Sequence, residues 1–440
     1  MSIYFGTDGI RGKYNDDLTV ELAYKIGNAL ASTTSNIKII IGKDTRSSGD
    51  ILSLSFACGA MNGGSSVTDV GICPTAGISY LTSNYDFDYG VIITASHNPA
   101  EYNGIKIFDK SGQKISDKQE ELLEKRLIKQ SYSDYSTVGK YYYKPELIEH
   151  YINYIDNLFN IDLCNKKIVI DCSNGASYYV ATKIFENKKA NLVKINTSPN
   201  GININDNCGA LHLEQLKAEV ITQHADFGFA YDGDSDRVIA ISNTGKIISG
   251  DILIYIISTY FKDSNKLTNP IIVGTKHTNM GIENELSKKG IKLIRTNIGD
   301  KYVSEELIRN NLNIGGEQSG HIIVRDYLPT GDGILNSLLL TYICSKMNKK
   351  LSDYENLDLY KQENINITVK NKYKIINDIS LKNLLAKKES ELKNIGRIML
   401  RMSGTEPCIR IMVESQDCSL SKKIANEFAE LILNLNKKYD

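Results

Sequence analysis

Short apolar runs that end in polar turns recur along the chain. A run of this length bounded by turn residues is typical of a buried β-strand. Three such runs lead into small polar turns, at residues 37–41, 168–170 and 271–273. Each is followed, 41 to 60 residues later, by a second apolar strand that leads into a polar loop. That spacing leaves room for a strand and one or two helices, so the pattern predicts three α/β domains of one design.

The loops after the second strands are unusually rich in polar and small residues. They read TASHNP at residues 94–99, DGDSDR at 232–237 and GEQSGH at 316–321. Open α/β sheets bind ligands at the carboxyl ends of their strands. We therefore expect each of the three domains to contribute one loop to a shared site.

Helical periodicity fills the stretches between the predicted strands. Residues 18–30 and 118–128 are amphipathic, and an apolar helix-like segment begins at Asp251. In contrast, residues 131–145 are crowded with Ser, Tyr, Asp and Gly and show no period, which predicts a linker between the first two domains.

The last part of the chain has a different pattern. Residues 364–369 and 409–413 alternate like strands with one wet face, and residues 420–435 have apolar positions at helical spacing. We expect a smaller α+β domain here, after three similar α/β domains with mixed sheets. The predicted boundaries are 1–145, 146–250, 251–363 and 364–440.

Composition narrows the class of protein. The 440 residues are 41% hydrophobic, and Lys plus Arg and Asp plus Glu both total 52, so no net field favours nucleic acid or an anionic membrane. Residues 1–11 lack an apolar signal-peptide core, and the longest apolar stretch, 252–261, is too short to span a bilayer. We expect a cytoplasmic protein without nucleic-acid or membrane partners, and the sequence leaves a homodimer open. The eight scattered cysteines have no zinc-ligand spacing, which predicts reduced, buried thiols.

Ser96 in the first loop is a candidate nucleophile. Its hydroxyl could take up a phosphoryl group, His97 beside it can move protons, and Lys106 follows on the next segment. Taken alone, these residues also fit an ordinary capped turn, so the other loops decide between the two interpretations.

The second loop places three carboxylates on alternate residues. In an extended backbone, Asp232, Asp234 and Asp236 point the same way. Two carboxylates about 5 Å apart repel by about 3 kcal/mol at an effective dielectric constant near 20. A divalent cation removes that repulsion, and carboxylates in a tight loop suit Mg²⁺. An EF-hand is excluded because its sixth and twelfth positions are Arg237 and Asn243. A phosphatase with an aspartate nucleophile remains open.

Two more segments carry candidate ligand-binding residues. Near the chain end, two arginines, two hydroxyls and a glycine form the inventory of a phosphate site: Arg401, Ser403, Gly404, Thr405 and Arg410. A hairpin turn with surface arginines would use the same residues. In the third loop, Glu317 could accept hydrogen bonds from sugar hydroxyls, with Ser319 and His321 as further polar contacts.

Five segments in this order resemble the α-D-phosphohexomutase superfamily, most closely its glucosamine-phosphate branch. They are residues 4–11 (YFGTDGIR), the three loops above, and residues 401–410 (RMSGTEPCIR). Gln318 and residues 297–303 (NIGDKYV) are typical of that branch. The match extends from end to end. Departures are few: Ser235 and Met402 replace more usual residues, and neither removes a ligand.

The resemblance implies a role for each segment. It implies that Ser96 carries the phosphoryl group and that Asp232, Asp234 and Asp236 hold Mg²⁺ together with Ser96. It also implies that the third loop binds the sugar and that the last domain binds the substrate phosphate. The candidate sugar and phosphate ligands are Arg237, Glu317, Ser319, His321, Arg401, Ser403, Gly404, Thr405 and Arg410.

The implied reaction converts glucosamine 6-phosphate into glucosamine 1-phosphate through a hexosamine 1,6-bisphosphate, which would feed UDP-N-acetylglucosamine synthesis. Phosphoserine, three aspartates and one Mg²⁺ leave the site about three positive charges short. Arg237, Lys106, Arg11 and His97 are the candidate sources, with Lys106 or His97 as general acid/base. A phosphoglucomutase or phosphomannomutase, an aspartate-nucleophile phosphatase and a non-catalytic sugar-phosphate binding protein are the alternatives.

Overall fold

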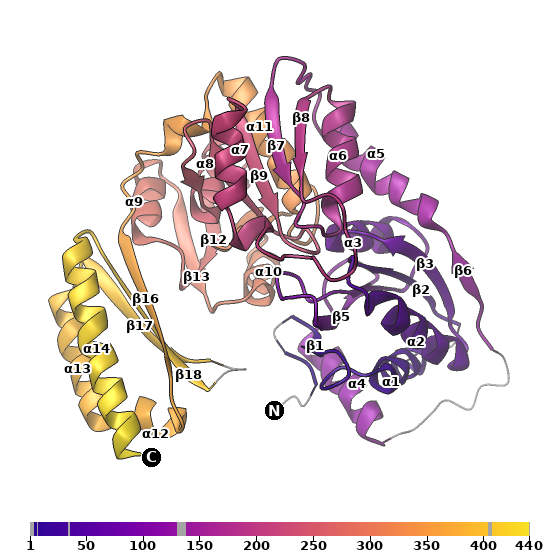
Figure 1. The fold of residues 1–440 in the computed structure, drawn as a ribbon, viewed down its shortest axis with the longest axis horizontal. Helices are drawn as coiled ribbons and strands as arrows, with labels where there is room; N and C mark the ends of the chain where they lie inside the picture. The colour runs from indigo at the N-terminus through magenta and orange to yellow at the C-terminus, as the bar shows by residue number, and fades with distance from the viewer. Residues whose placement is uncertain (1–3, 7, 34–35, 130–137, 404–406, 440) are drawn as a thin grey trace. The chain divides into compact units, whose positions relative to one another are not determined.

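The computed structural model describes residues 1–440 except 1–3, 7, 34–35, 130–137, 404–406 and 440. The chain divides into two compact units, which are described separately (Figure 1). Unit 1 comprises residues 1–277 and 290–356, and unit 2 comprises residues 278–289 and 357–440.

The first sheet of unit 1 has six strands in the order β1-β5-β4-β2-β3-β6. Their bounds are β1 Ile10–Lys13, β2 Lys38–Lys43, β3 Ser66–Ile72, β4 Tyr89–Ile93, β5 Tyr102–Asp109 and β6 Tyr141–Tyr143. The associated helices are α1 Val20–Ala31, α2 Gly49–Asn62, α3 Thr75–Asn84 and α4 Asp117–Lys129. Apolar side chains of α1, α2 and α4 pack with those of β2 and β4 in one core.

Two smaller sheets complete unit 1, in the orders β11-β10-β9-β7-β8 and β13-β12-β14-β15. The second sheet contains β7 Lys167–Asp171, β8 Asn191–Ile195, β9 Phe227–Tyr231, β10 Val238–Ser242 and β11 Ile247–Ile248. The third contains β12 Ile271–Thr275, β13 Lys292–Thr296, β14 Ile314–Gly316 and β15 Ile322–Val324. Their helices are α5 Ile148–Leu158, α6 Ser177–Asn187, α7 Glu214–Thr222, α8 Gly250–Asp263, α10 Asp300–Arg309 and α11 Gly333–Met347.

The three sheets of unit 1 share one central motif. In each, a middle strand (β2, β7 or β12) pairs in parallel with two neighbours, and one neighbour (β4, β9 or β14) then pairs antiparallel with the strand that follows it. The three polar loops connect the antiparallel pairs β4-β5, β9-β10 and β14-β15. The predicted α/β repeat is therefore confirmed, and it places the loops at equivalent positions.

Unit 2 is built on a three-stranded antiparallel sheet in the order β16-β18-β17. The strands are β16 Lys361–Thr368, β17 Gly396–Met402 and β18 Cys408–Ser415, and the helices are α9 Met280–Lys288, α12 Lys372–Ile376, α13 Ile379–Glu391 and α14 Cys418–Lys438. Figure 1 shows α13 and α14 side by side along this sheet. Ile409, Ile411 and Val413 of β18 pack against Phe428 and Ile432 of α14, which confirms the predicted α+β arrangement.

Three local predictions need correction. The expected linker, 131–145, contains β6, which pairs in parallel with β3 and extends the first sheet; the part at 131–137 lies outside the described residues. The three residues of β6 are tyrosines, which favour strands, although the composition of the whole segment is typical of a linker. The two arginines expected in a turn lie within strands, because β17 ends at Met402 and β18 begins at Cys408. Finally, three of the eight thiols are exposed rather than buried, those of Cys58, Cys164 and Cys418.

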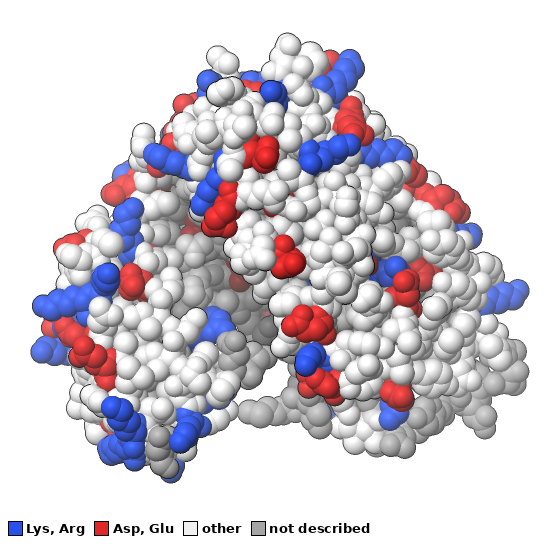
Figure 2. All heavy atoms as spheres, in the orientation of Figure 1, with Lys and Arg blue, Asp and Glu red and all other residues white. Residues whose placement is uncertain are grey.

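The surface agrees with the balanced charge count. On the face drawn in Figure 2, basic and acidic side chains are interspersed over each unit. Among the described residues, no helix is both long enough and apolar enough to cross a bilayer.

Candidate active site

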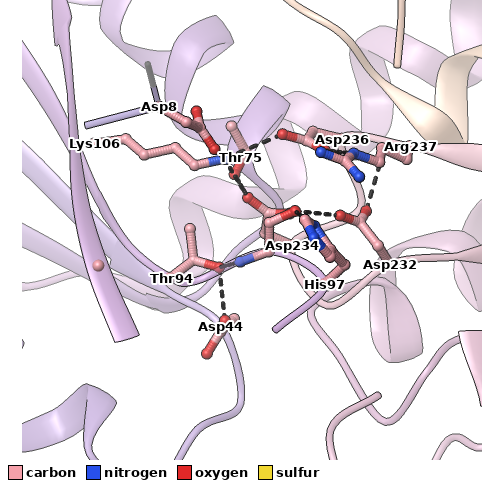
Figure 3. A network of polar contacts seen from close by, with 12 residues as sticks. Asp8, Asp44, Thr75, Thr94, His97, Lys106, Asp232, Asp234, Asp236 and Arg237 are labelled. Carbon is pink, nitrogen blue, oxygen red and sulfur yellow. Dashed lines mark hydrogen bonds and ion pairs between the residues drawn. The ribbon is translucent and has the colours of Figure 1, made fainter. Parts of the chain in front are cut away.

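Ser96, the third residue of the polar loop after β4, has a left-handed backbone conformation, with φ of 52°. This conformation is sterically costly for a residue with a Cβ atom. The Thr94 hydroxyl accepts a hydrogen bond from the Ser96 amide at 2.9 Å and donates one to Asp44 at 2.6 Å. The strained turn is therefore held by a buried side-chain network (Figure 3).

Arg46 holds the same loop by donating hydrogen bonds to backbone carbonyl groups of the loop. Its buried guanidinium donates to the carbonyl oxygens of Ser96 at 2.9 Å, Asn98 at 2.7 Å and Tyr102 at 3.0 Å, and to that of Pro99. Asp44 accepts from Arg46 Nε at 2.9 Å, which sets the plane of the guanidinium. Sequence analysis missed this residue, because a hydrogen bond to a distant carbonyl leaves no local pattern.

The three aspartates of the second loop converge as predicted. One carboxylate oxygen from each of Asp232, Asp234 and Asp236 lies within 4.8 Å of the others, and all three side chains are buried. Gly233 lets this loop meet the Ser96 loop, since a Cβ atom at position 233 would lie 2.6 Å from the Ser96 carbonyl oxygen. The sequence thus brings the hydroxyl and the carboxylates of two domains into one cluster.

The Ser96 hydroxyl is directed at this cluster. Its Oγ donates to Asp232 Oδ2 at 2.6 Å, and His97 Nδ1 lies 3.4 Å from the same Oγ. The ring of His97 is largely enclosed, and burial followed by the nearby Arg237 and Arg11 lowers its pKa to about 4. The imidazole is therefore neutral at neutral pH and can accept a proton.

Lys106 on β5 is the cation nearest to the cluster (Figure 3). Its buried Nζ lies 2.8 Å from Asp234, 3.1 Å from Asp236 and 3.2 Å from Asp8. Burial alone would lower the pKa of Lys106, but the three carboxylates raise it well above its usual value. Lys106 therefore stays protonated and supplies a positive charge next to the aspartates.

The carboxylates differ in their surroundings. Burial, reinforced by the other two aspartates, raises the pKa of Asp232 well above its usual range. Burial also acts on Asp236, but Lys106, His321 and Arg237 outweigh it and hold the pKa of Asp236 well below that range. The cluster is short of positive charge on the Asp232 side, next to Ser96.

The donor set fits a hard divalent cation. Asp234 Oδ1 is buried and has no hydrogen-bond partner among the described residues, and Asp236 Oδ1 meets only His321 Nδ1 at 3.5 Å and Arg237 Nε at 3.7 Å. Buried oxygens of this kind normally have partners. Three clustered carboxylates with free acceptor capacity match the oxygen ligands that Mg²⁺ prefers.

The third loop contributes residues to the same region of unit 1. Glu317 accepts a hydrogen bond from the Gly299 amide at 3.0 Å, and Ser319 is half-buried. His321 is buried, and its imidazole lies between Asp236 and Asp300, with Nε2 3.7 Å from Asp300 Oδ2. His321 thus contacts the aspartate cluster directly.

The amino-terminal segment adds a further charged pair. Arg11 donates to Asp8 at 2.5 Å and to Asn98 of the Ser96 loop at 3.2 Å. Asp8, which sequence analysis did not single out, also pairs with Lys106 and Lys114. Burial would raise the pKa of Asp8, but these lysines and Arg11 lower it strongly. The segment therefore contributes a third carboxylate to Lys106 Nζ, in addition to those of Asp234 and Asp236.

The candidate phosphate-binding residues lie in unit 2. Arg401 and Arg410 are directly opposite each other on β17 and β18. Burial and then the neighbouring Arg410 lower the pKa of Arg401. Two like charges opposite each other are unfavourable without an anion. Ser403 is buried and its amide donates to the Cys408 carbonyl at 2.9 Å, whereas Gly404 and Thr405 lie outside the described residues.

Profiles of known families match almost the whole chain. The phosphoglucomutase/phosphomannomutase α/β/α domains I, II and III match residues 2–134, 149–245 and 249–360, and the C-terminal domain of the same family matches residues 365–431.

Curated relatives match over nearly their full length. A phosphoglucosamine mutase of Clostridioides difficile is 42% identical over 444 residues, covering 98% of this chain and 99% of the relative. A phosphoglucosamine mutase of Dictyoglomus thermophilum is 43% identical over 424 residues, covering 94% and 92%.

Solved structures share the fold. A phosphoglucomutase/phosphomannomutase family protein from Burkholderia thailandensis aligns with a TM-score of 0.83 at 23% identity, over 98% of this chain and 97% of that one. The N-acetylphosphoglucosamine mutase of Aspergillus fumigatus, in complex with GlcNAc-6P and magnesium, aligns with a TM-score of 0.67 at 16% identity, over 99% and 96%.

Proposed function

Because this chain belongs to the phosphoglucosamine mutases of the α-D-phosphohexomutase superfamily, we propose that it interconverts glucosamine 6-phosphate and glucosamine 1-phosphate. It is an isomerase that transfers a phosphoryl group within its substrate. The observation that carries the mechanism is the buried Ser96 hydroxyl, 2.6 Å from the aspartate cluster.

In the proposed reaction, Ser96 enters the cycle as phosphoserine. The bond from phosphorus to Ser96 Oγ breaks as a bond to a sugar hydroxyl oxygen forms, and a base takes the hydroxyl proton. The hexosamine 1,6-bisphosphate then reorients in the site, and its other phosphoryl group passes to Ser96 Oγ while the base returns the proton to the sugar oxygen that is released. This regenerates the phosphoenzyme. Hydroxyl and phosphoryl groups balance over the cycle, so no other co-reactant is consumed.

Asp232, Asp234 and Asp236 are the proposed ligands of Mg²⁺, together with the Ser96 oxygen or its phosphoryl group. When bound, Mg²⁺ would neutralise charge on the transferring oxygens. Asp234 Oδ1, which no described residue hydrogen-bonds, and the short Ser96–Asp232 contact support this assignment. The fungal relative in complex with magnesium supports it by analogy.

The chain's own cations supply the remaining positive charge. Phosphoryl transfer depends mainly on positioning and on charge placed where the transferring oxygens will be. Lys106, Arg237 and Arg11 are proposed to provide that charge, since all three lie among carboxylates that orient them. His97 is proposed to exchange the proton, because its Nδ1 lies 3.4 Å from Ser96 Oγ. Of the two candidates for the general acid/base, Lys106 and His97, we therefore propose His97.

Substrate binding is proposed for two further groups. Glu317 and Ser319 would bind the sugar hydroxyls or amine. His321, which contacts the aspartate cluster, would be a further ligand of the substrate. Arg401, Ser403, Gly404, Thr405 and Arg410 would bind the phosphate that is not being transferred. The opposed pair Arg401 and Arg410 supports this role, because two paired guanidinium groups suit a phosphate dianion.

The product would feed UDP-N-acetylglucosamine synthesis, a source of cell wall precursor, and we place the enzyme in the cytoplasm with a small-molecule sugar phosphate as its partner. Neither nucleic acid nor a membrane has a part in the proposed reaction. A homodimer is the assembly to test by light scattering.

A coupled assay tests the proposed reaction. Purified enzyme is given glucosamine, glucose or mannose 6-phosphate with Mg²⁺ and a hexose 1,6-bisphosphate, and 1-phosphate formation is followed. We expect the highest kcat/KM with glucosamine phosphate. Preference for glucose or mannose phosphate would assign the chain to another mutase activity of the superfamily. Release of inorganic phosphate without isomerisation would favour an aspartate-nucleophile phosphatase.

A further inference from the structure

Six side chains of unit 1 form a closed ring in which carboxylates alternate with basic groups. In order, the ring is Lys106, Asp8, Lys114, Asp300, His321, Asp236 and again Lys106. The contacts include Lys106 to Asp8 at 3.2 Å, His321 to Asp236 at 3.5 Å and Asp236 to Lys106 at 3.1 Å. The ring therefore begins and ends at the catalytic cluster, and three of its members, Asp8, Lys114 and Asp300, have no role in the proposed reaction.

Lys114 and Asp300 form the far side of this ring. Lys114 follows β5 and makes ion pairs with Asp8 and with Asp300, the first residue of α10. Asp300 in turn lies 3.7 Å from His321 Nε2, a buried nitrogen with no hydrogen-bond partner among the described residues. The side chains of Lys114 and Asp300 are 18% and 14% exposed, so water screens this ion pair only weakly.

We propose that Lys114 and Asp300 are positioning residues, which hold Lys106 through Asp8 and hold Asp236 through His321. The inference rests on the proposed mutase function, since it assigns a purpose to Lys106 and Asp236 in that reaction. It concerns residues outside the substrate and metal ligands proposed above.

The physical reason is the charge balance along the ring. Each carboxylate of the ring lies between two basic groups, so it is attracted electrostatically from both sides. Without the Lys114 cation, Asp8 is left with Lys106 and Arg11, and Asp300 is left with His321 alone in the ring. Both carboxylates would then draw these partners away from the aspartate cluster. Displacements of about 1 Å at a reacting group can cost about 100-fold in rate.

Lys301 provides a matched control. It joins α10 to α4, the helix that follows the Lys114 segment, through ion pairs with Asp117 and with Glu120 at 3.0 Å, and its side chain is 15% exposed against 18% for Lys114. Among the described residues its ammonium forms no ion pair with a ring member, and its backbone amide, which donates to Asp300 Oδ1 at 2.9 Å, is retained in Lys301→Met. If Lys114 merely fastens the segment between β5 and α4 to α10, removal of either lysine should have the same effect.

The experiment compares full-length wild type, Lys114→Met, Asp300→Asn, Lys114→Arg and Lys301→Met. For each we would measure kcat and KM for glucosamine 6-phosphate, Mg²⁺ affinity of the metal-free protein by calorimetry, and the thermal midpoint. We expect Lys114→Met and Asp300→Asn to lower kcat by about 10-fold to 100-fold and to weaken Mg²⁺ binding, as is usual when supporting groups around metal ligands are removed. KM should change little, because the phosphate-binding arginines are untouched.

Lys301→Met should keep wild-type kcat and Mg²⁺ affinity, and Lys114→Arg should recover part of the lost kcat because it keeps the charge but not the geometry. The inference is overturned if Lys114→Met and Lys301→Met behave alike, if kcat is unchanged in Asp300→Asn, or if the variants lose only thermal stability. A wild-type protein without mutase activity would instead contradict the proposed function.

Discussion

Arg46 is the residue whose replacement tests most sharply how the fold holds Ser96. The substitution Arg46→Lys keeps a positive charge beside the buried Asp44, so it avoids an uncompensated carboxylate. It removes the planar fork that donates to four carbonyl oxygens of the segment from Ser96 to Tyr102. A lysine ammonium cannot reproduce that geometry.

The size of the effect follows from the hydrogen bonds. Asn205 also donates to the carbonyls of Ser96 and Asn98, at 2.9 and 3.1 Å, and the Tyr102 amide donates to the Pro99 carbonyl at 3.1 Å, so these three keep a partner. The Tyr102 carbonyl loses its charged donor, and for a hydrogen bond to a charged group the loss of stability is about 2 kcal/mol. Because the Ser96 turn is strained, the loosened loop should relax, and we expect kcat to fall about 100-fold.

Denaturant unfolding and the coupled mutase assay measure the two effects. Arg325→Lys is the matched control, since Arg325 donates to the carbonyls of Leu307 and Leu312, at 3.0 and 3.1 Å, away from the Ser96 loop. The control should lose stability but keep kcat. A kcat for Arg46→Lys within the range of the Arg325→Lys variant would refute the reasoning.

Three further outcomes are expected. Asp234→Asn should weaken Mg²⁺ binding and lower kcat about 100-fold or more, measured by calorimetry and assay; unchanged Mg²⁺ affinity would contradict the ligand assignment. Arg410→Ala should raise KM for the sugar phosphate about 30-fold, equivalent to about 2 kcal/mol of binding free energy, and an unchanged KM would place the phosphate elsewhere. Burial raises the pKa of Asp332, the N-cap of α11, from 3.8 to about 6. Protonated Asp332 therefore stabilises the folded state below pH 3.8, and this stabilisation is lost as pH rises through about 6. Asp332→Asn should flatten the dependence of the unfolding midpoint on pH in that window, and an unaltered slope would show that another group titrates there.

The elements that carry a period were predictable from the sequence. The apolar runs before residues 94, 232 and 316 became β4, β9 and β14, since a buried strand needs continuous apolar residues and leaves that pattern behind. The aspartate cluster followed because alternate residues share one side of an extended loop, and the three oxygens do converge.

Long-range polar contacts were not predictable in the same way. Arg46, Asp8 and Lys114 each act through a partner 50 or more residues away, and no local spacing reports such a contact. The same holds for β6, whose pairing with β3 overrides a composition typical of a linker. Arg401 and Arg410 were predicted to bind an anion, but their direct opposition depends on a strand register that a turn-rich sequence does not define.

The central claim is that Ser96 carries the phosphoryl group that isomerises the sugar. Enzyme labelled with isotopic phosphate is digested to locate the label, then mixed with unlabelled glucosamine 6-phosphate. The account predicts label on Ser96 that moves to the sugar phosphates, with neither label nor isomerisation in Ser96→Ala. Label on an aspartate, or release of the label as inorganic phosphate while Ser96→Ala remains fully active, would contradict it.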